Sequence, residues 1–305
     1  MVHDLLGACF DIDSLPPGRS IEDLFHDSIV TGNPKPLEEL WKCLAEADNF
    51  ITRQLNCADG RQNNAYLKFL RDFPSTPLLT FNYGSLPEIL LSGEGTWNPT
   101  DGYGVTVRTG VGFCPKKTII PASRRHVLHL HGTFCVYPAK FEIVASSGGW
   151  DGLLQHKDQT DFYFDPDNLV GHFQIKFPFE AYRPRPNPNF IPITDRVIAP
   201  VPDKSKGLKG EFVKAAYCRA IDWIRGATQI VAIGYSFNRN DLSSYSSLLD
   251  AAEGKSILLV APDAASLINR LRRDRKKIRW AAERMLFKDW VRREYPGLEA
   301  HKCFA

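Results

Sequence analysis

The stretch from Thr228 to Val260 constrains the fold of this chain most strongly. Thr228–Gly234 is a β-branched apolar run that predicts a strand, Asp241–Ala252 has a helical pattern, and Ser256–Val260 predicts a second apolar strand. A strand, a helix and a strand at this spacing form a right-handed crossover unit whose strands are parallel. Because parallel sheets are covered by helices on both faces, the stretch predicts an α/β fold.

Similar patterns extend this fold toward the N-terminus. Further strands are expected at Pro77–Phe81 and His126–Leu130, and Leu208–Arg225 is an amphipathic helix that ends at Gly226. Residues 93–112 are rich in Gly, Thr and Pro, which indicates a loop with a hairpin. A short strand before Gly7 and several helices complete the pattern, the helices at 21–25 with Ser20 as N-cap, 36–50, 63–73 and 86–91.

Residues 134–195 differ from the rest of the chain. Aromatic and Pro residues crowd together, and regular periodicity is hard to find. A structureless loop of that length is uncommon inside a compact domain. We therefore interpret 134–195 as an aromatic/Pro-rich insertion or small subdomain, packed by its own aromatic side chains near the mouth of a site, within a single domain that spans residues 1–305.

Four of the expected strands end in conspicuous polar or Gly residues. In an open parallel sheet, ligands bind beyond the carboxyl ends of the strands. One Gly after one strand is more often only a tight turn, but four such ends together predict a ligand site. The four ends are Gly7-Ala8-Cys9-Phe10-Asp11, Phe81-Asn82-Tyr83-Gly84, His129-Leu130-His131-Gly132 and Gly234-Tyr235-Ser236-Phe237.

The order of these motifs resembles that of the sirtuin-like NAD-hydrolase family. That family shows a Gly-Ala-Gly-x-Ser loop, a Thr-x-Asn-Tyr-Asp segment, a Leu-His-Gly segment, and a Gly-Tyr-Ser segment with an Asp shortly beyond it. The matching pieces here are Leu6–Asp11, Thr80–Gly84, Leu130–Gly132, and Gly234–Ser236 with Asp241. The resemblance is to the bacterial antiphage-defence branch, without the zinc module, and it implies a Rossmann-like parallel sheet with helices on both faces.

The resemblance implies cleavage of the nicotinamide–ribose bond of NAD to give ADP-ribose and nicotinamide. This reaction passes through an oxocarbenium-like centre and needs a base to activate water or a ribose hydroxyl. His131 is the candidate base, because imidazole titrates near neutral pH, and Asn82 is expected to hold the ribose or orient the water. The other expected contacts are the pyrophosphate turn Gly7, Ala8, Cys9, Phe10 and Asp11, the adenosine-side residues Ser236 and Asp241, and Tyr83, Gly132 and Gly234.

Three positions depart from the family pattern. Cys9 replaces a Gly, Asp11 stands where the family has Ser, and Gly84 replaces the Asp of Asn-Tyr-Asp. A side chain at position 9 limits the approach of the backbone to phosphate, and a carboxylate near pyrophosphate is repulsive. The alternative function is therefore a catalytically weak or inactive module that binds NAD or ADP-ribose as a sensor or scaffold.

The sequence offers little support for a metal site. His129 and His131 form a His-x-His pair, which can bind metal, but no third ligand lies at recognisable spacing. A second interpretation makes His126 and His129 hydrogen-bonded histidines of the core or sheet edge. The seven cysteines are scattered without a Cys-x-x-Cys motif, so no metal is expected, and their odd number without a framework predicts reduced thiols.

Charge is concentrated near the C-terminus. The net charge is +3, but residues 269–293 hold eleven Lys/Arg and three Asp/Glu, so this segment carries +8 and the remaining chain −5. Leu271, Ile278 and Met285 fall at helical spacing, which predicts one helix docked on the last strand with its basic side chains outward. We expect a solvated basic face, and a nucleic-acid surface is the minority alternative.

The N-terminus lacks the pattern of a signal peptide, and no apolar run approaches the roughly 18 residues of a membrane helix. Together with reduced thiols, this predicts a cytoplasmic protein that makes no membrane contact. Because an enzyme that depletes NAD must be held inactive, an activating protein partner or a homo-oligomer is also considered.

Overall fold

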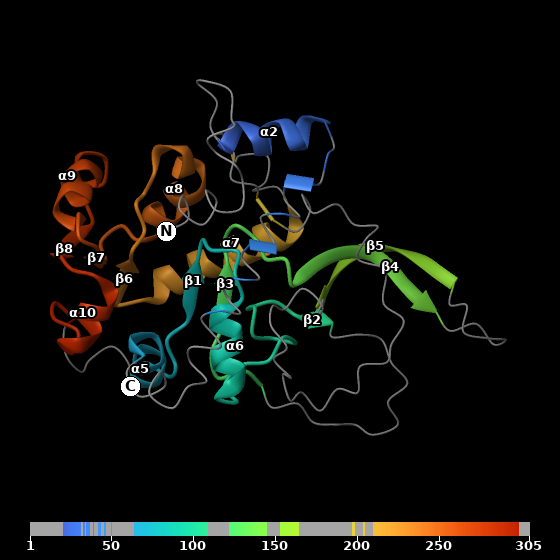
Figure 1. Ribbon diagram of the computed structural model, residues 1–305, viewed down its shortest axis with the longest axis horizontal. Helices are drawn as coiled ribbons and strands as arrows, with labels where there is room; N and C mark the ends of the chain where they lie inside the picture. Colours follow the sequence, from blue (N-terminus) through green and yellow to red (C-terminus); the bar gives the residue numbers. More distant parts are fainter. Residues whose placement is uncertain are drawn as a thin grey trace. The chain divides into compact units, whose positions relative to one another are not determined.

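The computed structural model describes residues 21–31, 64–108, 122–144, 153–164 and 210–298, with single positions between 33 and 50, residues 197–198 and residue 204 (Figure 1). The chain divides into two compact units. The first unit is Met1–Gln54 with Pro77–Ala216, and the second unit is Leu55–Thr76 with Tyr217–Ala305. Parallel strands accompanied by helices confirm the α/β class, whereas the expectation of a single domain over 1–305 stays a prediction.

The second unit contains the crossover pattern expected from Thr228 to Val260. Its strands β6 (Gln229–Ile233), β7 (Ser256–Val260) and β8 (Arg279–Glu283) form a parallel sheet in that order. Helix α8 (Leu242–Ala251) connects β6 to β7, and α9 (Ala264–Asp274) connects β7 to β8. The bounds of β7 match the expected ones, and β6 and α8 lie inside theirs. Helix α7 (Glu211–Gly226) precedes β6.

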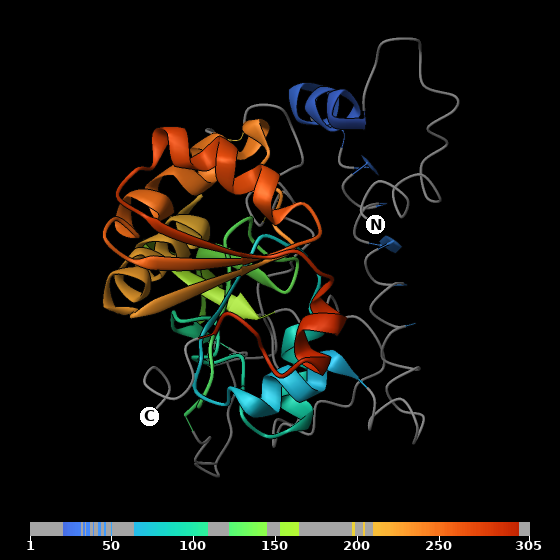
Figure 2. The ribbon, with the colours of Figure 1, turned by 90° about the vertical axis from the view of Figure 1, so that its left-hand side faces the viewer.

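Helices cover both faces of the second unit's sheet (Figure 2). Side chains of a strand alternate between the faces, so Leu258 and Val260 share one face of β7. They pack there against α10 (Phe287–Arg292) and α5 (Ala65–Asp72). Helix α9 lies along the opposite face and packs on β7 and β8. The buried residues of this cluster are Leu258, Val260, Trp290 and Val291, and the partly buried Ala65, Phe69, Val231, Ile233, Met285, Phe287, Tyr295 and Leu298 pack against them.

The expectation of one continuous basic helix near the C-terminus is wrong. Helix α9 ends at Asp274, and the chain then forms strand β8 and helix α10. Strand β8 pairs with β7 along its whole length, from Ser256↔Arg279 to Val260↔Glu283, and these backbone hydrogen bonds override the local helical pattern. The expected apolar stripe still reaches the core, because Leu271 and Ile278 are buried and Met285 is partly buried, but its residues come from three different segments.

The strands that carry the expected catalytic residues lie in the first unit. Strand β1 (Leu78–Thr80) pairs in parallel with β3 (Val127–His129), with Thr80 opposite His129. Both strands lie inside the expected ranges Pro77–Phe81 and His126–Leu130. Helix α6 (Leu86–Gly93) follows β1 after a short loop.

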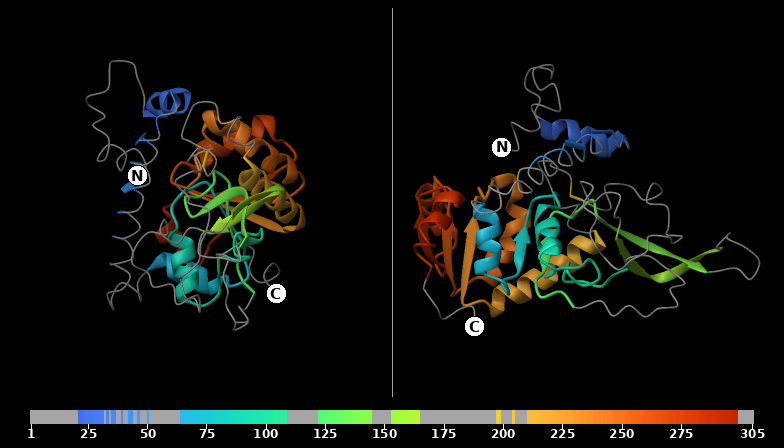
Figure 3. Two further views of the ribbon diagram at one scale, coloured as in Figure 1. Left: turned by 90° about the vertical axis from the view of Figure 1, so that its right-hand side faces the viewer. Right: turned by 60° about the horizontal axis from the view of Figure 1, so that its bottom comes forward.

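The described part of residues 134–195 forms regular β-structure, which its aromatic- and Pro-rich composition did not indicate. Strands β4 (Val136–Val144) and β5 (Leu153–Phe164) form a long antiparallel hairpin (Figure 3), and the rings of Tyr137 and Tyr163 stack at 5.7 Å. Strand β2 (Val107–Arg108) pairs in parallel with β5. The described part of 93–112 therefore joins this sheet, where a local hairpin was expected.

Other expectations are met in part. Helix α2 (Ile21–Thr31) begins where expected and continues past Phe25, while Ser20 and the first strand lie outside the described residues. In the described ranges, no helix is both long and apolar enough to cross a membrane. Cys135 and Cys218 form no disulfide, as expected, but Cys43 is disulfide-bonded, so the expectation of reduced thiols is wrong at that position.

Candidate functional site

The expected site residues fall into three groups. The turn from Gly7 to Asp11 lies outside the described residues. The loops after β1 and β3 of the first unit hold Asn82, Tyr83, His131 and Gly132, and the segment after β6 of the second unit holds Gly234, Ser236 and Asp241.

Asn82 has an exposed side chain on a fixed backbone. It lies in the loop between β1 and α6, and its N–H donates to Thr80 Oγ1 at 3.0 Å. Its carbonyl oxygen lies 2.8 Å from His129 Nδ1. Hydrogen bonds to the N–H and the carbonyl of Asn82 hold its main chain in place. The exposed amide side chain therefore projects from a fixed backbone.

His131 follows β3 in a tight turn and is almost fully covered, with 4% of its surface exposed. The ring of Phe81 meets its imidazole edge-on at 4.9 Å between centroids, and the ring of Tyr83 lies 6.1 Å away. Gly132 has φ +80°, a left-handed conformation that favours glycine, which lets its N–H donate to His129 O at 3.1 Å. The candidate base therefore sits in an aromatic surrounding that excludes most water.

Ile198 links the loops after β1 and β3. Its N–H donates to His131 O at 2.7 Å, and its carbonyl accepts a 2.5 Å hydrogen bond from the Tyr83 hydroxyl. Its neighbour Val197 forms an antiparallel bridge with Gly132. The structure thus brings Asn82, Tyr83, His131 and Gly132 together through main-chain and Tyr83 contacts, as their position at strand ends predicts.

A buried acid–imidazole pair beneath these loops was missed by sequence reasoning. Glu88 in the first turn of α6 and His129 at the end of β3 are both 0% exposed, and Glu88 Oε1 lies 2.5 Å from His129 Nε2. The sequence held a signal, because Glu88 is the only charged residue in the apolar run Leu86–Leu91. His129 is thus a hydrogen-bonded core histidine, which was the second interpretation of this residue.

Tyr103 extends the buried polar group. Its burial, together with the neighbouring Cys135 and Glu88, raises the pKa of the Tyr103 hydroxyl well above its usual range. The phenol is therefore neutral at physiological pH and adds no charge beside Glu88 and His129. Its ring also lies 6.1 Å from that of His129, which encloses the imidazole further.

Metal coordination by a His129/His131 pair conflicts with this geometry. Both ring nitrogens of His129 already face oxygen atoms, those of Asn82 and Glu88, so the ring offers no lone pair to a metal. Within the described ranges, no group of three or more His, Cys, Asp or Glu side chains could hold a metal ion.

In the second unit, the loop after β6 is held through its main chain. Gly234 has φ +64°, and its N–H donates to Val260 O at 3.0 Å. Arg270 of α9 donates from Nη2 to the carbonyls of Ser236 and Phe237 at 2.7 and 2.8 Å. Phe237, with φ +48°, is buried, whereas Ser236 is exposed. The loop thus presents Ser236 outward beside a cation.

Asp241 ends the short 3-10 turn η6 (Arg239–Asp241) and contacts the same loop. The hydroxyl of Tyr235 donates to Asp241 Oδ2 at 3.4 Å. Burial raises the pKa of Tyr235, and the negative charge of Asp241 raises it further. Gly234, Ser236 and Asp241 therefore belong to one local arrangement, with Asp241 engaged by Tyr235.

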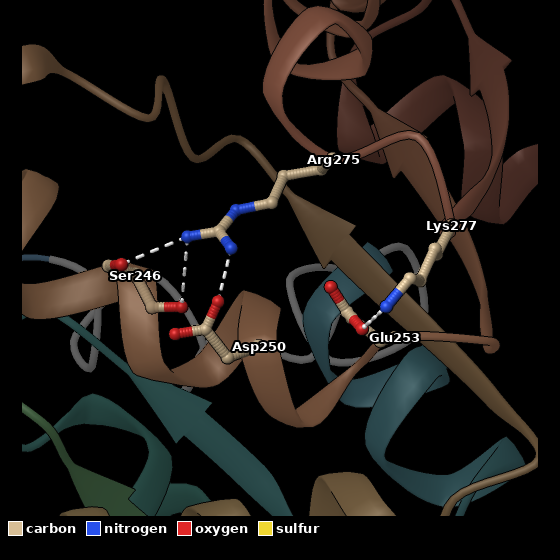
Figure 4. A network of polar contacts seen from close by, with 5 residues as sticks. All are labelled: Ser246, Asp250, Glu253, Arg275 and Lys277. Carbon is tan, nitrogen blue, oxygen red and sulfur yellow. Dashed lines mark hydrogen bonds and ion pairs between the residues drawn. The ribbon is translucent and has the colours of Figure 1, made fainter.

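Some cations of the basic C-terminal segment, residues 269–293, form ion pairs and hydrogen bonds with neighbouring residues. Arg275 pairs with Asp250 and donates to Ser246 Oγ at 2.9 Å, and Lys277 Nζ lies 2.8 Å from Glu253 Oε2 (Figure 4). These contacts join the turn after α9 to α8 and the turn that follows it. The exposed cations of the segment are Arg272, Arg273, Lys276, Lys277, Arg279, Arg284, Lys288, Arg292 and Arg293.

A scan of the sequence against models of protein families finds no match, and a search of curated proteins finds none either. The interpretation of this site therefore depends on its own residues and geometry.

Proposed function

We propose that the protein is an NAD-hydrolysing enzyme that cleaves the nicotinamide–ribose bond and releases ADP-ribose and nicotinamide. One observation carries the proposal: the exposed Asn82 side chain and the shielded His131 imidazole follow neighbouring parallel strands, in loops that Ile198 links. An amide and an imidazole are the groups that the reaction needs, one to position ribose or water and one to accept a proton.

The surroundings of His131 support its role as the base. Rings of Phe81 and Tyr83 cover the imidazole, and exclusion of water strengthens electrostatic interactions with a developing positive charge on the ribose. In this mechanism His131 accepts a proton from water or a ribose hydroxyl as nicotinamide leaves, and Asn82 holds the attacking group or the ribose. NAD is the substrate, and no metal takes part.

The wider proposal follows the resemblance to the sirtuin-like antiphage-defence enzymes. It includes a Rossmann-like core, with pyrophosphate at Gly7–Asp11 and adenosine beside Gly234, Ser236 and Asp241. The half-buried Arg270 beside the second of these segments supplies positive charge suited to a nucleotide. The proposal also includes a cytoplasmic location, against which the Cys43 disulfide counts, and control by a protein partner or by self-assembly.

The second candidate function is an NAD- or ADP-ribose-binding module without turnover. The specific observation in its favour is the burial of His131, of which 4% is exposed, because a base that substrate cannot reach accepts no proton. Gly84, in place of the family's Asp, removes one further polar group from the same loop.

Incubation of the pure protein with NAD, followed by chromatography of released nicotinamide, tests the first function. We expect His131→Ala to lower the rate about 100- to 10,000-fold, the range of general acid–base catalysis. We expect Asn82→Ala to lower it about 100-fold or more, since a lost positioning or charge-stabilising donor has that effect. His26→Ala and Asn269→Ala, at exposed positions of α2 and α9, are the controls and should retain the wild-type rate.

Calorimetry with NAD and ADP-ribose separates the two functions. Binding without nicotinamide release supports the binding module, and release that persists in His131→Ala removes His131 as the base. Absence of binding to either nucleotide contradicts both functions.

A further inference from the structure

The buried pair of Glu88 and His129 has no direct route to substrate, since both side chains are fully covered. His129, however, also contacts a residue at the surface. His129 Nδ1 lies 2.8 Å from the carbonyl oxygen of Asn82, whose own side chain is exposed. The pair therefore touches the main chain of the residue to which the proposed function assigns substrate positioning.

The geometry determines where the protons of this pair lie. A carbonyl oxygen only accepts hydrogen bonds, so His129 Nδ1 must carry a proton that it donates to Asn82 O. At 2.5 Å, Nε2 and Glu88 Oε1 must share one further proton, because two bare lone pairs would repel. Whether that proton resides on nitrogen or oxygen, the pair is neutral overall, and the Nδ1 proton is retained in both forms.

Glu88 thereby favours the form of His129 that carries a proton on Nδ1 and donates it to the carbonyl oxygen of Asn82. An imidazole protonated only at Nε2 would turn a lone pair toward the Asn82 carbonyl and push the loop away. Asn82 N–H is held separately by Thr80 Oγ1, so the His129 bond supplies the second of two anchors on the residue. Loss of one anchor lets the amide move, and a displacement near 1 Å at a reacting centre can reduce the rate about 100-fold.

We propose that Glu88 and His129 are positioning residues that fix Asn82 for cleavage of NAD. This inference rests on the proposed function, and it assigns a role to two residues that never touch the substrate. It differs from a purely structural role, in which the pair would only fill the core and support the fold.

Two substitutions of His129 separate these roles. The amide nitrogen of Asn is as many bonds from Cα as Nδ1, so His129→Asn can still donate to Asn82 O. The amide nitrogen of Gln corresponds to Nε2, so His129→Gln can still meet Glu88 but not Asn82. We expect His129→Asn to keep kcat within about threefold of wild type and His129→Gln to lose about 10- to 100-fold in kcat with little change in KM. Glu88→Gln, whose amide can donate to Nε2 and leave the Nδ1 proton in place, should restore most of the rate lost in Glu88→Ala.

A double-mutant cycle gives the sharper readout. If the pair acts through Asn82, His129→Gln should have almost no effect on kcat in an Asn82→Ala background, although it lowers kcat in the wild type. Equal losses in His129→Asn and His129→Gln, or losses that multiply with that of Asn82→Ala, overturn the positioning role.

An NMR measurement without NAD distinguishes failure of this inference from failure of the proposed function. We expect the amide signals of Asn82 and Tyr83 to shift in His129→Gln and to stay near wild-type positions in His129→Asn. A protein that neither binds nor cleaves NAD contradicts the proposed function while these shifts still show whether His129 fixes Asn82. Signals that are unchanged in His129→Gln overturn the inference even if NAD is cleaved.

Discussion

The loop after β1 in the first unit and the loop after β6 in the second unit are held by side chains that differ in burial. In the first unit, the fully buried Glu88 and His129 hold the Asn82 carbonyl. In the second unit, the half-buried guanidinium of Arg270 holds the carbonyls of Ser236 and Phe237. Water can replace Arg270 at its carbonyls but cannot reach the atoms that Glu88 satisfies. The first unit should therefore be sensitive to the loss of one polar side chain, and the second should tolerate it.

Removal of the buried carboxylate should have the largest effect. We expect Glu88→Ala to lower the free energy of unfolding by about 2–3 kcal/mol, because it removes the hydrogen-bond partner of the fully buried His129 Nε2. Urea unfolding followed by tryptophan fluorescence measures the change. Glu46→Ala, at an exposed position of the same unit, should cost no more than about 0.5 kcal/mol. A loss below about 1 kcal/mol for Glu88→Ala would show that the first unit has no special dependence on the pair.

Removal of Arg270 should have a smaller and more local effect. We expect Arg270→Met to cost about 1–2 kcal/mol, at the lower part of the range for hydrogen bonds to a charged group, since water screens this half-exposed side chain. Hydrogen exchange at residues 235–238 should accelerate more than exchange in β7. Arg272→Met, on the exposed side of α9, is the control and should change neither. Exchange that accelerates throughout the second unit would contradict a local role.

The backbone of the β6 loop allows a finer test. Gly234 has φ +64°, and no atom lies within 4 Å of where a Cβ would stand. Gly234→Ala should therefore cost only backbone strain, about 1 kcal/mol. Gly226→Ala is the matched control, because that position also has open space but lacks a positive φ, and it should be neutral or slightly stabilising. Equal thermal stability of the two variants would show that the left-handed conformation is not what requires glycine at 234.

The smallest effect is expected from the surface contacts of Figure 4. Lys277 and Glu253 pair through side chains that are 75% and 42% exposed, so Lys277→Met should lower the melting temperature only slightly, and the decrease should shrink in high salt. Thermal unfolding at low and high ionic strength measures it, with Lys276→Met, at an exposed neighbouring position, as control. A large, salt-independent loss would mean that the second unit also depends on individual polar contacts.

Local pattern was enough to locate the strand ends that carry the candidate site. Asn82 and His131 follow β1 and β3 as expected, because an apolar run between Pro, Gly and Asn marks a strand without reference to the rest of the chain. Glu88 was not singled out, although a lone carboxylate in an apolar run indicates a buried partner. Its partner, His129, is 41 positions away in the chain, and nothing in the spacing connects the two.

In the C-terminal region, the local sequence pattern predicted the wrong element because the pairing of strands was not visible in it. Leu271, Ile278 and Met285 recur at helical spacing, yet Arg279–Glu283 forms a strand. A helix satisfies its backbone within the segment, whereas a strand depends on a neighbour, and here that neighbour is β7. Likewise, β4 and β5 satisfy their hydrogen bonds through each other, so the aromatic and Pro-rich composition of 134–195 concealed them.

The sequence by itself determined the α/β class, the position of β7 and the residues that follow each strand, because short-range hydrophobic patterns and turn residues encode these features. Only the tertiary structure decided that Glu88 meets His129, that His129 holds Asn82 and that Arg270 holds the loop after β6. These contacts join residues remote in the chain, and their directional hydrogen bonds exist only once the strands and helices have packed.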